Sequence, residues 1–384
     1  MIRVGFVFVF DGSWLGGINY FRNLLTALYA LSDGKIEPVI LTGTHMSAEQ
    51  LVDFPPFEVV RSRLFDRYTL PWAVRKVWHR SFGHDLLLER LLVKHHIAVL
   101  SHSGHLGRHA CIPTIGWLPD FQHRRMPDFF SIAELKRREQ QFSEDLECSR
   151  VIVSSFDAQA DLSAFYPTCV ERTRVLQFVA NLDTQIVCPS LDVIKKKYAI
   201  KGVYFHLPNQ FWIHKNHEVV IDALRVLKDQ GECVVVVVTG NKSDYRRAGH
   251  FQLLMARVEE CGVAEDFKVI GVVPYPDLIA LMQHSVALIN PSFFEGWSTT
   301  VEESKALGKR IILSDIPVHR EQSPERGWYF NPHSPDALAA AMKQLLGSWN
   351  ADEEGEWAAH AIAALPTRRE DFARKFQDIV LELC

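Results

Sequence analysis

Apolar runs of strand length alternate along the chain with segments whose apolar residues recur at helical spacing. This alternation predicts parallel sheets flanked by helices, which is an α/β fold. The predicted strands are Val4–Phe10, Pro38–Leu41, Phe57–Val60, Ile97–Ser101, Thr114–Leu118, Val151–Ser154, Arg174–Phe178, Tyr204–Leu207, Cys233–Val238, Lys268–Val272, Val286–Asn290 and Arg310–Leu313. The predicted helices lie near Asn19–Leu31, Asp85–His95, Ile132–Glu147, Phe156–Phe165, Asn216–Asp229, Phe251–Cys261, Pro276–His284, Thr300–Leu307 and Asp336–Leu345.

The length of the chain, 384 residues, predicts two domains, because a single hydrophobic core usually stops growing below that size. The segment Ala180–Ala199 is weakly patterned and carries a Pro-Ser turn signal, which marks it as the domain junction. We therefore predict an N-terminal domain over residues 1–185 and a C-terminal domain over residues 186–365. A terminal helix, Arg369–Leu383, is predicted within residues 366–384.

The composition is that of an ordinary globular protein, with 47% hydrophobic and 23% charged residues. A net charge of −4 gives no sign of nucleic-acid binding. The seven cysteines are scattered without a Cys-x-x-Cys pair, which favours reduced thiols in a cytoplasm over disulfides or a zinc site. The N-terminal run MIRVGFVFVF is predicted to be a first strand, not a signal peptide. No run of about 18 apolar residues occurs, so no transmembrane helix is expected.

The most informative motif is INPSFFEGWSTTVEESKALGKRIILSDIPVHREQ, which spans Ile289–Gln322. An apolar run ends in Asn-Pro-Ser, and a Ser-Thr-Thr triplet then opens a segment with helical spacing. This pattern predicts a strand, a loop and a helix, with the free N–H groups of the helix at the carboxyl edge of a parallel sheet. Glu295 is predicted in the loop and Glu303 about one turn into the helix.

The spacing Glu-x7-Glu within this motif resembles the donor site of retaining glycosyltransferases of family 4, which have the GT-B fold. The resemblance implies two Rossmann-like domains whose parallel sheets face a central cleft, and a terminal helix that crosses back to the first domain. It also implies that Glu303 binds ribose hydroxyls, that Glu295 binds the donor sugar, and that the amides of Ser298, Thr299 and Thr300 face the diphosphate. The alternative is that both glutamates are solvated residues of a helix start.

A second motif, LPNQFWIHKNHEVVIDAL, places Lys215 at a strand-to-helix edge, where a lysine can neutralise a diphosphate. In family 4 the corresponding region carries a phosphate-binding arginine followed by such a lysine. Lys215 matches the lysine, but Asn209 stands where the arginine is expected. Gln210, His214 or a basic residue from the other domain could compensate, because developing phosphate charge needs a preorganised donor. The alternative is that Lys215 is a surface lysine beside a helix cap.

Two further segments of the first half resemble family 4 more loosely. Gly16 and Gly17 resemble a glycine-rich loop that approaches the donor phosphates, although Gly-Gly is common in any strand-to-helix turn. In the segment Ile115–Ser131, Pro119 takes the place of the usual acceptor-side histidine. Asp120 is therefore the first candidate for a residue near the acceptor hydroxyl and His123 the second. The alternative is a Pro-Asp turn followed by a surface histidine.

The sequence gives little support to metal catalysis. No Asp-x-Asp occurs, and the histidines lack acidic or cysteine companions at ligand spacing. We therefore expect no metal and no cofactor, with the nucleoside diphosphate sugar acting as a substrate.

The last feature is the basic, aromatic-rich span Arg61–His84, in which Arg75, Lys76 and Arg80 lie among aromatic residues. This pattern is typical of a helix that meets anionic headgroups, although a partner interface or a solvated helix has the same pattern. It predicts peripheral contact with the inner face of a membrane by a cytoplasmic protein.

The resemblance as a whole implies a retaining enzyme that transfers a hexosyl or deoxyhexosyl group, mannosyl or rhamnosyl being favoured, to a hydroxyl of a saccharide or lipid-linked saccharide acceptor. Such an enzyme would act in the assembly of a surface polysaccharide or lipopolysaccharide. Two alternatives remain open. One is a GT-B epimerase that acts on the sugar nucleotide alone. The other is a non-catalytic subunit that binds the sugar nucleotide, which the departures at Asn209 and Pro119 favour.

Overall fold

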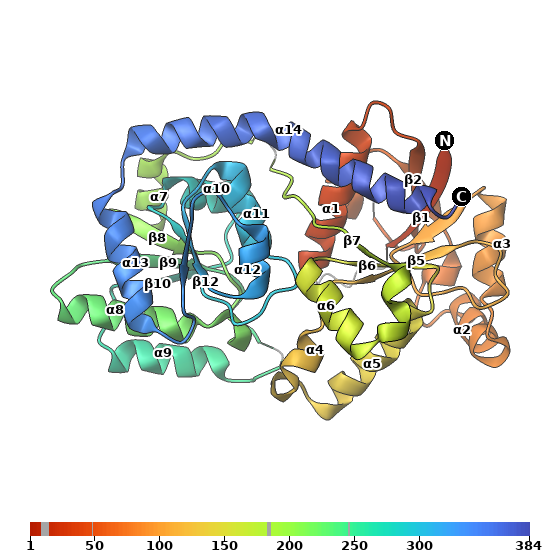
Figure 1. The fold of residues 1–384 in the computed structure, drawn as a ribbon, viewed down its shortest axis with the longest axis horizontal. Helices are drawn as coiled ribbons and strands as arrows, with labels where there is room; N and C mark the ends of the chain where they lie inside the picture. Colours follow the sequence, from red (N-terminus) through yellow and green to blue (C-terminus); the bar gives the residue numbers. More distant parts are fainter. Residues whose placement is uncertain (9–14, 48, 183–185, 245) are drawn as a thin grey trace. The chain divides into compact units, whose positions relative to one another are not determined.

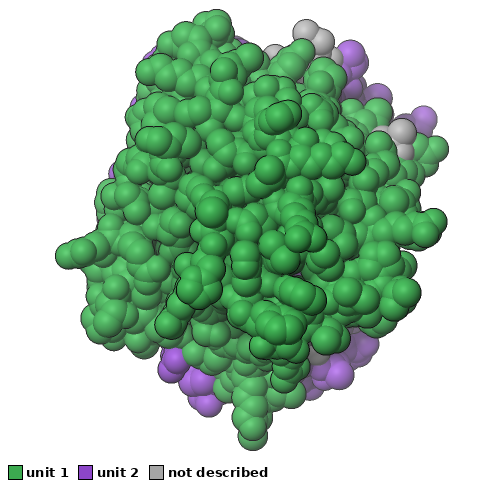
Figure 2. All heavy atoms as spheres, turned by 90° about the vertical axis from the view of Figure 1, so that its right-hand side faces the viewer, with its two compact units in different colours: residues 1–121, 132–181, 367–384 green, residues 122–131, 182–366 purple. Residues whose placement is uncertain are grey.

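The computed structural model describes residues 1–8, 15–47, 49–182, 186–244 and 246–384. The chain forms two compact units, which Figure 2 colours separately. Unit 1 comprises Met1–Phe121, Ile132–Asn181 and Thr367–Cys384, and unit 2 comprises Gln122–Ser131 and Leu182–Pro366. The predicted strand end at Val9 and Phe10 lies outside the described residues.

Both units alternate strands with helices along the chain (Figure 1). Unit 1 contains β1 (Ile2–Phe8), α1 (Leu15–Ala30), β2 (Ile36–Thr42), β3 (Glu58–Arg61), α2 (Leu70–Phe82), α3 (Leu86–Lys94), β4 (Val99–Ser101), β5 (Thr114–Leu118), α5 (Ile132–Leu146), β6 (Arg150–Val153), α6 (Phe156–Phe165) and β7 (Thr173–Val175). Unit 2 contains α4 (Gln122–Arg125), α7 (Leu191–Tyr198), β8 (Tyr204–Leu207), α8 (His217–Asp229), β9 (Val235–Thr239), α9 (His250–Glu260), β10 (Phe267–Gly271), α10 (Tyr275–His284), β11 (Leu288–Asn290), α11 (Thr299–Leu307), β12 (Ile311–Ser314), α12 (Pro317–Gln322), β13 (Gly327–Phe330) and α13 (Pro335–Gly347).

The sheet of unit 1 has seven strands in the order β3-β2-β1-β4-β5-β6-β7, and the neighbouring strands pair in parallel. Successive side chains of a strand point to opposite faces, so each face needs its own cover. On one face Phe6 packs against Phe21 of α1 and Phe376 of the C-terminal helix, with ring centroids 6.5 and 5.7 Å away. On the other face Val39 and Leu41 of β2 belong to a buried cluster with residues of α3.

The sheet of unit 2 has six strands in the order β10-β9-β8-β11-β12-β13, also paired in parallel. Phe205 and Val236 point into a large cluster formed with α8, α9 and α13. Tyr204 and Val237, one position away, point into a second cluster formed with α7 and α10. Helices therefore cover both faces, which explains why β8 and β9 read as nearly continuous apolar runs.

The C-terminal helix α14 spans Ala351–Leu381 and contributes residues to both units. It begins earlier than the predicted terminal helix, because Asn350 caps it by accepting hydrogen bonds from the N–H groups of Asp352 and Glu353. Pro366 lies inside the helix. Proline removes one donor from a helix interior. The predicted helix begins three residues after this proline, at Arg369.

The first turn of α14 is held to unit 2 by a cluster of buried cations around Glu354. Its carboxylate lies 2.7 Å from Lys309 Nζ and 2.7 Å from Arg326 Nη2. The Lys309 and Arg326 side chains are only 4% and 6% exposed, so little water could replace a lost partner. Removing one partner from a buried ion pair is strongly destabilising, so this contact is important for the fold.

We expect Glu354→Gln to lower the free energy of unfolding by about 3 kcal/mol, because it leaves buried cations without their closest carboxylate. The matched control is Glu356→Gln, which changes an exposed glutamate two positions further along the same helix. Urea unfolding of both variants measures the difference. Equal midpoints for the two variants would show that the cluster contributes nothing.

All seven cysteines are free thiols. Within the described ranges, no helix combines the length and the apolar character that crossing a membrane requires.

Candidate functional site

The candidate site lies in unit 2, where the strand order reverses. Strands β9 and β10 lie on one side of β8, and β11, the next strand along the chain, lies on the other side of β8. In open α/β sheets ligands bind at the carboxyl ends of the strands at such a switch point. Lys215 follows β8 and Glu295 follows β11, so the topology brings these two distant residues to one edge.

Asn216 holds the backbone of the loop that carries Lys215. Lys215 ends a short 3₁₀ helix, Ile213–Lys215, and Asn216 then takes a left-handed conformation with φ 53° before α8 begins. The Asn216 side-chain amide donates to the carbonyls of Pro291 and Pro332, at 3.0 and 2.9 Å. Asparagine tolerates this conformation better than most residues. The loop after β8 is thereby tied to the loop after β11.

Glu295 is the centre of the site. Its Oε1 accepts from Lys215 Nζ at 2.6 Å, from Ser292 Oγ at 2.7 Å and from Asn290 Nδ2 at 3.4 Å. The two charged side chains are largely buried, with 15% exposure for Lys215 and 9% for Glu295. Burial alone would raise the pKa of Glu295, but the Lys215 ammonium and the Ser292 hydroxyl bring it below its ordinary value. Glu295 is thus a carboxylate, and its Oε2 has no hydrogen bond to any described residue.

Asn209 has a neutral side chain, and it stabilises the site through hydrogen bonds. Its amide donates to Asn290 Oδ1 at 3.2 Å, and its carbonyl oxygen accepts from the Thr300 hydroxyl at 3.4 Å. Asn290 in turn donates to Ser298 Oγ at 2.7 Å. This chain of hydrogen bonds links the ends of β8 and β11 to the start of α11. All four side chains are buried, so the network is a rigid support.

Ser298 caps α11, and its own amide is already used. Ser298 Oγ accepts from the N–H of Val301, while the Ser298 N–H donates to Gln322 Oε1 at 3.1 Å. Gln322 returns a hydrogen bond from Nε2 to the Ser298 carbonyl at 3.0 Å. The Ser298 amide is therefore engaged within the protein, and its predicted role toward phosphate stays a prediction. The N–H groups of Thr299 and Thr300 stay available, because the first donors of a helix have no partner within it.

Glu303 lies on α11, one turn beyond these amides, and is half-buried. Its carboxyl has neither a hydrogen bond nor an ion pair within the described part of the chain. Burial raises its pKa from 4.5 to about 8. The neighbouring Glu302 differs, because it is fully buried and contacts Lys305 and Gln322. A half-buried acid of this kind is a candidate ligand-binding group.

His214 and Gln210 lie in the same loop as Lys215. His214 is buried, and its Nδ1 lies 3.3 Å from Arg246 Nη2. Arg246 also contacts Asp244 and lies over the Trp212 ring, 4.8 Å from its centroid. Gln210 is half-buried, and its carbonyl accepts from the N–H of Trp212. A basic residue therefore does stand beside His214, but its charge is partly matched by Asp244.

The remaining predicted residues are not brought into this network. Gly16 and Gly17 form the first turn of α1 in unit 1, and Asp11–Trp14 of that loop lie outside the described residues. Asp120 follows β5 in unit 1 and is half-buried. His123 is buried in α4, which belongs to unit 2. The roles predicted for these four residues stay predictions.

Sequence reasoning missed Asn290, Ser292, Gln322 and His319. His319 is fully buried and hydrogen-bonds the Ser314 carbonyl through Nδ1 at 2.9 Å, and burial lowers its pKa to about 4. Asn290 and Ser292 were detectable, because the Asn-Pro-Ser triplet ends a strand beside Glu295. Gln322 lies 24 positions from Ser298, and no local pattern could pair the two.

Among the described residues, no group of three His, Cys, Asp or Glu side chains is arranged to hold a metal ion. The site can instead offer one ammonium, two helix N–H groups, one carboxylate with a free oxygen and one partly buried acid.

Comparison with known proteins places the chain among glycosyltransferases by similarity. Residues 194–360 match the family described as "Glycosyl transferases group 1". The O-antigen chain mannosyltransferase RfbU of Salmonella typhimurium is 24% identical over 232 residues, which cover 54% of this chain. The matched region is 61% of the length of RfbU, so the chain aligns with somewhat less than two thirds of that relative.

Solved structures match the chain over its full length. A glycosyltransferase from Rickettsia africae superposes with a TM-score of 0.70 at 15% identity, covering 100% of this chain and 98% of the other. Anabaena Alr3699/HepE, solved with UDP and glucose, superposes with a TM-score of 0.66 at 15% identity, covering 100% and 99%. The predicted fold class is confirmed: the two parallel-sheet units form the GT-B fold.

Proposed function

We propose that this protein is a glycosyltransferase that takes its sugar from a nucleoside diphosphate sugar. The observation that carries the proposal is the Lys215–Glu295 pair at the switch point of unit 2, beside the N–H groups of Thr299 and Thr300, which have no partner within helix α11. The match of residues 194–360 to the glycosyltransferase family supports it, because this stretch contains every one of these groups. HepE, a neighbour in fold, was solved with UDP and glucose.

Each group of the site has a role in this proposal. Lys215 and the amides of Thr299 and Thr300 neutralise the diphosphate, as helix N-termini and ammonium groups do for phosphate elsewhere. Oε2 of Glu295 accepts from a hydroxyl of the donor sugar, since Oε1 is saturated by its three donors. Glu303 binds the ribose hydroxyls.

We propose a metal-independent reaction of the family 4 type, with retention of anomeric configuration. The bond between the anomeric carbon and the diphosphate oxygen breaks, and its electron pair leaves with the diphosphate. The acceptor hydroxyl forms the new bond on the same face of the sugar, and its proton passes to the leaving phosphate. Lys215 accelerates the step because its charge stabilises negative charge that develops as the bond breaks.

We further propose that the sugar is a hexosyl or deoxyhexosyl group, mannosyl or rhamnosyl being favoured, and that the product belongs to a surface polysaccharide or lipopolysaccharide. The similarity to RfbU, an O-antigen chain mannosyltransferase, supports this choice. The acceptor is a saccharide or lipid-linked saccharide, and the proposed location is the cytoplasmic face of the inner membrane.

A single assay distinguishes this function from its alternatives. The protein is incubated with sugar nucleotides, with and without a saccharide acceptor, and nucleotide release, epimer formation and glycoside formation are followed by NMR. Glycoside formation with an unchanged anomeric configuration supports the proposal. Epimerised donor without an acceptor would indicate an epimerase, and donor binding without turnover would indicate a non-catalytic subunit.

We expect transfer to continue in the presence of excess EDTA, at a rate within about twofold of the untreated enzyme. The reason is that Lys215 and two helix N–H groups stabilise the leaving diphosphate without a cation. The measurement is the initial rate of nucleotide release before and after chelation. Activity that disappears with EDTA and returns with Mg²⁺ or Mn²⁺ would show that the diphosphate needs a cation.

A further inference from the structure

Unit 1 has a switch point of its own, between β1 and β4, and a cavity of about 450 Å³ borders it. Val7, near the end of β1, and Ser103, just after β4, line this cavity. The cavity therefore lies at the carboxyl edge of the sheet, where open α/β sheets bind ligands. Its volume is within the range of small-molecule sites.

Among the described residues, the lining of the cavity includes three cations, Arg67, Arg75 and Lys76, and no carboxylate. Arg75 belongs to the fold, because its Nε donates to buried Asp85 at 2.7 Å and its Nη1 donates to the Leu64 carbonyl. Arg67 and Lys76 differ from it. Neither makes a hydrogen bond or an ion pair within the described ranges, and Glu144 and Asp85 act on the Lys76 ammonium only from beyond ion-pair distance. The two cations therefore have no direct carboxylate partner among the described residues.

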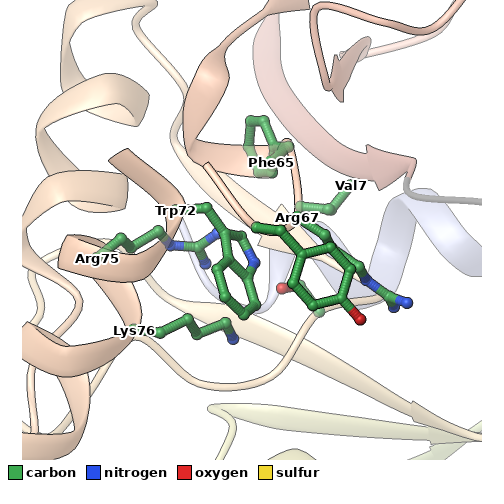
Figure 3. Close-up of a pocket in the computed structure, with 8 residues that line it drawn as sticks. Val7, Phe65, Arg67, Trp72, Arg75 and Lys76 are labelled. Carbon is green, nitrogen blue, oxygen red and sulfur yellow. The ribbon is translucent and has the colours of Figure 1, made fainter. Parts of the chain in front are cut away.

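Two aromatic side chains complete the lining. The Tyr68 and Trp72 rings lie with their centroids 5.9 Å apart. In Figure 3 the Trp72 indole lies between the Arg75 and Lys76 side chains on one side and Arg67 on the other. Tyr68 has a positive φ of 66° and is 91% exposed. A bulky residue held in that conformation costs free energy and, in an exposed position, is typical of functional sites.

Helix α2, which carries Trp72, Arg75 and Lys76, has an apolar face that no other described part of the chain buries. No residue of this helix is buried. The α2 stripe is formed by Leu70, Val74, Val77, Trp78 and Phe82, which are 77%, 44%, 65%, 40% and 64% exposed. Their spacing places them along one side of the helix. An exposed apolar face beside a cationic cavity is the arrangement of a surface that meets an anionic amphiphile.

We propose that this cavity binds the diphosphate head of a lipid-linked saccharide acceptor, with its hydrocarbon chain lying against the α2 stripe. This inference rests on the proposed function, because it assumes transfer to an acceptor. Arg67 and Lys76 contact the diphosphate, and Tyr68 and Trp72 contact the first sugar or the start of the chain. The charge of the cavity and the apolar stripe are then explained by one molecule.

The basic residues of α2 have different places in this proposal. The sequence singled out Arg75, Lys76 and Arg80 as one basic group. The structure separates them: Arg75 is held by Asp85, Lys76 faces the cavity, and Arg80 is an exposed residue outside its lining. Arg80→Gln is therefore a matched control for Lys76→Gln on the same helix.

The test measures binding by calorimetry, without any sugar nucleotide. The probe is farnesyl diphosphate, an isoprenyl diphosphate that dissolves as monomers, and the comparison probes are farnesol and inorganic diphosphate. The variants are the double variant Arg67→Gln/Lys76→Gln, the control Arg80→Gln, and Val77→Ser/Phe82→Ser in the α2 stripe. All of these side chains are exposed, so the variants are expected to fold.

We expect the double variant to bind farnesyl diphosphate about 10–100-fold more weakly, because two charge-assisted contacts are lost. Arg80→Gln should bind like the unchanged protein. The stripe variant should lose affinity for farnesyl diphosphate but not for inorganic diphosphate. Equal binding by the double variant and the control would overturn the proposal. If inorganic diphosphate binds as tightly as farnesyl diphosphate, the proposal that the cavity region binds a lipid is overturned. The same holds if the protein dimerises through α2 and the stripe variant abolishes this dimer.

The proposed glycosyltransferase function and the proposed lipid-binding cavity can be refuted independently of each other. Sugar transfer by the unchanged protein, measured as glycoside formation with a saccharide acceptor, tests the site of unit 2. A protein that turns over no sugar nucleotide with or without an acceptor but binds farnesyl diphosphate as expected would refute the glycosyltransferase and leave the cavity assignment standing. A protein that forms a glycoside and binds the lipid probe equally well in every variant would refute the cavity assignment and leave the glycosyltransferase standing.

Discussion

Lys215→Ala is expected to lower the rate of glycosyl transfer by about 10²–10³-fold, the usual effect of removing one preorganised group that stabilises developing charge. It should also lower the stability of the protein, because Glu295 loses its closest cation while remaining largely buried. Breaking a buried ion pair typically costs about 3–5 kcal/mol, and the residual exposure of this pair places the expected loss at the lower end.

The two effects of Lys215→Ala can be separated with a second variant. In Lys215→Ala/Glu295→Gln the buried carboxylate becomes neutral, so the free energy of unfolding should recover while the rate does not. Lys201→Ala, at an exposed lysine outside the site, is the control for loss of a charge. Steady-state kinetics and urea unfolding give both quantities. A rate within about tenfold of the unchanged enzyme in Lys215→Ala would remove this residue from the catalytic step.

Hydrophobic periodicity predicted most strands well, because strands covered on both faces leave continuous apolar runs. The predicted ranges Thr114–Leu118 and Tyr204–Leu207 have the same bounds as β5 and β8. The missed elements are those whose pattern is weak. β13 (Gly327–Phe330) is a short edge strand with only one buried residue, and α7 (Leu191–Tyr198) is a lysine-rich helix with only Ile194 buried. Elements that bury little apolar surface leave little periodic signal.

The candidate site also contains residues that the sequence could predict and residues that it could not. Lys215 and Glu295 were predictable, because each follows the end of a strand, and the sheet topology brings the ends of adjacent strands together. The use of the Ser298 amide was not predictable, since it depends on Gln322, which reaches the site from α12.

In helix α2, too, the sequence alone could not show which partner each side chain has. Its basic and aromatic composition was visible in the sequence, but only the structure separates Arg75, which pairs with Asp85, from Lys76, which faces the cavity.

Donor affinity is expected to rise with pH up to about 8 because of Glu303. Without ligand, its pKa of about 8 keeps this carboxyl protonated at neutral pH. A ribose diol presents two donors, so it binds the carboxylate better than the acid, and each such hydrogen bond contributes roughly 1.5–3 kcal/mol. Binding must then release a proton below pH 8, and affinity should increase by up to about tenfold per pH unit. Above the pKa the dependence should disappear.

Calorimetry in buffers with different ionisation enthalpies counts the released proton, and Glu303→Gln is the control that keeps the shape but cannot ionise. The variant should bind donor more weakly and release no proton from this position.

The stability of the ligand-free protein supplies an independent check. A carboxyl whose folded pKa is raised from 4.5 to about 8 stabilises the fold below pH 4.5, and this contribution is lost as the pH rises to about 8. The unchanged protein should therefore lose stability relative to Glu303→Gln across that interval. A stability difference that stays constant with pH would mean that Glu303 titrates normally, and the predicted pH dependence of donor binding would fall with it.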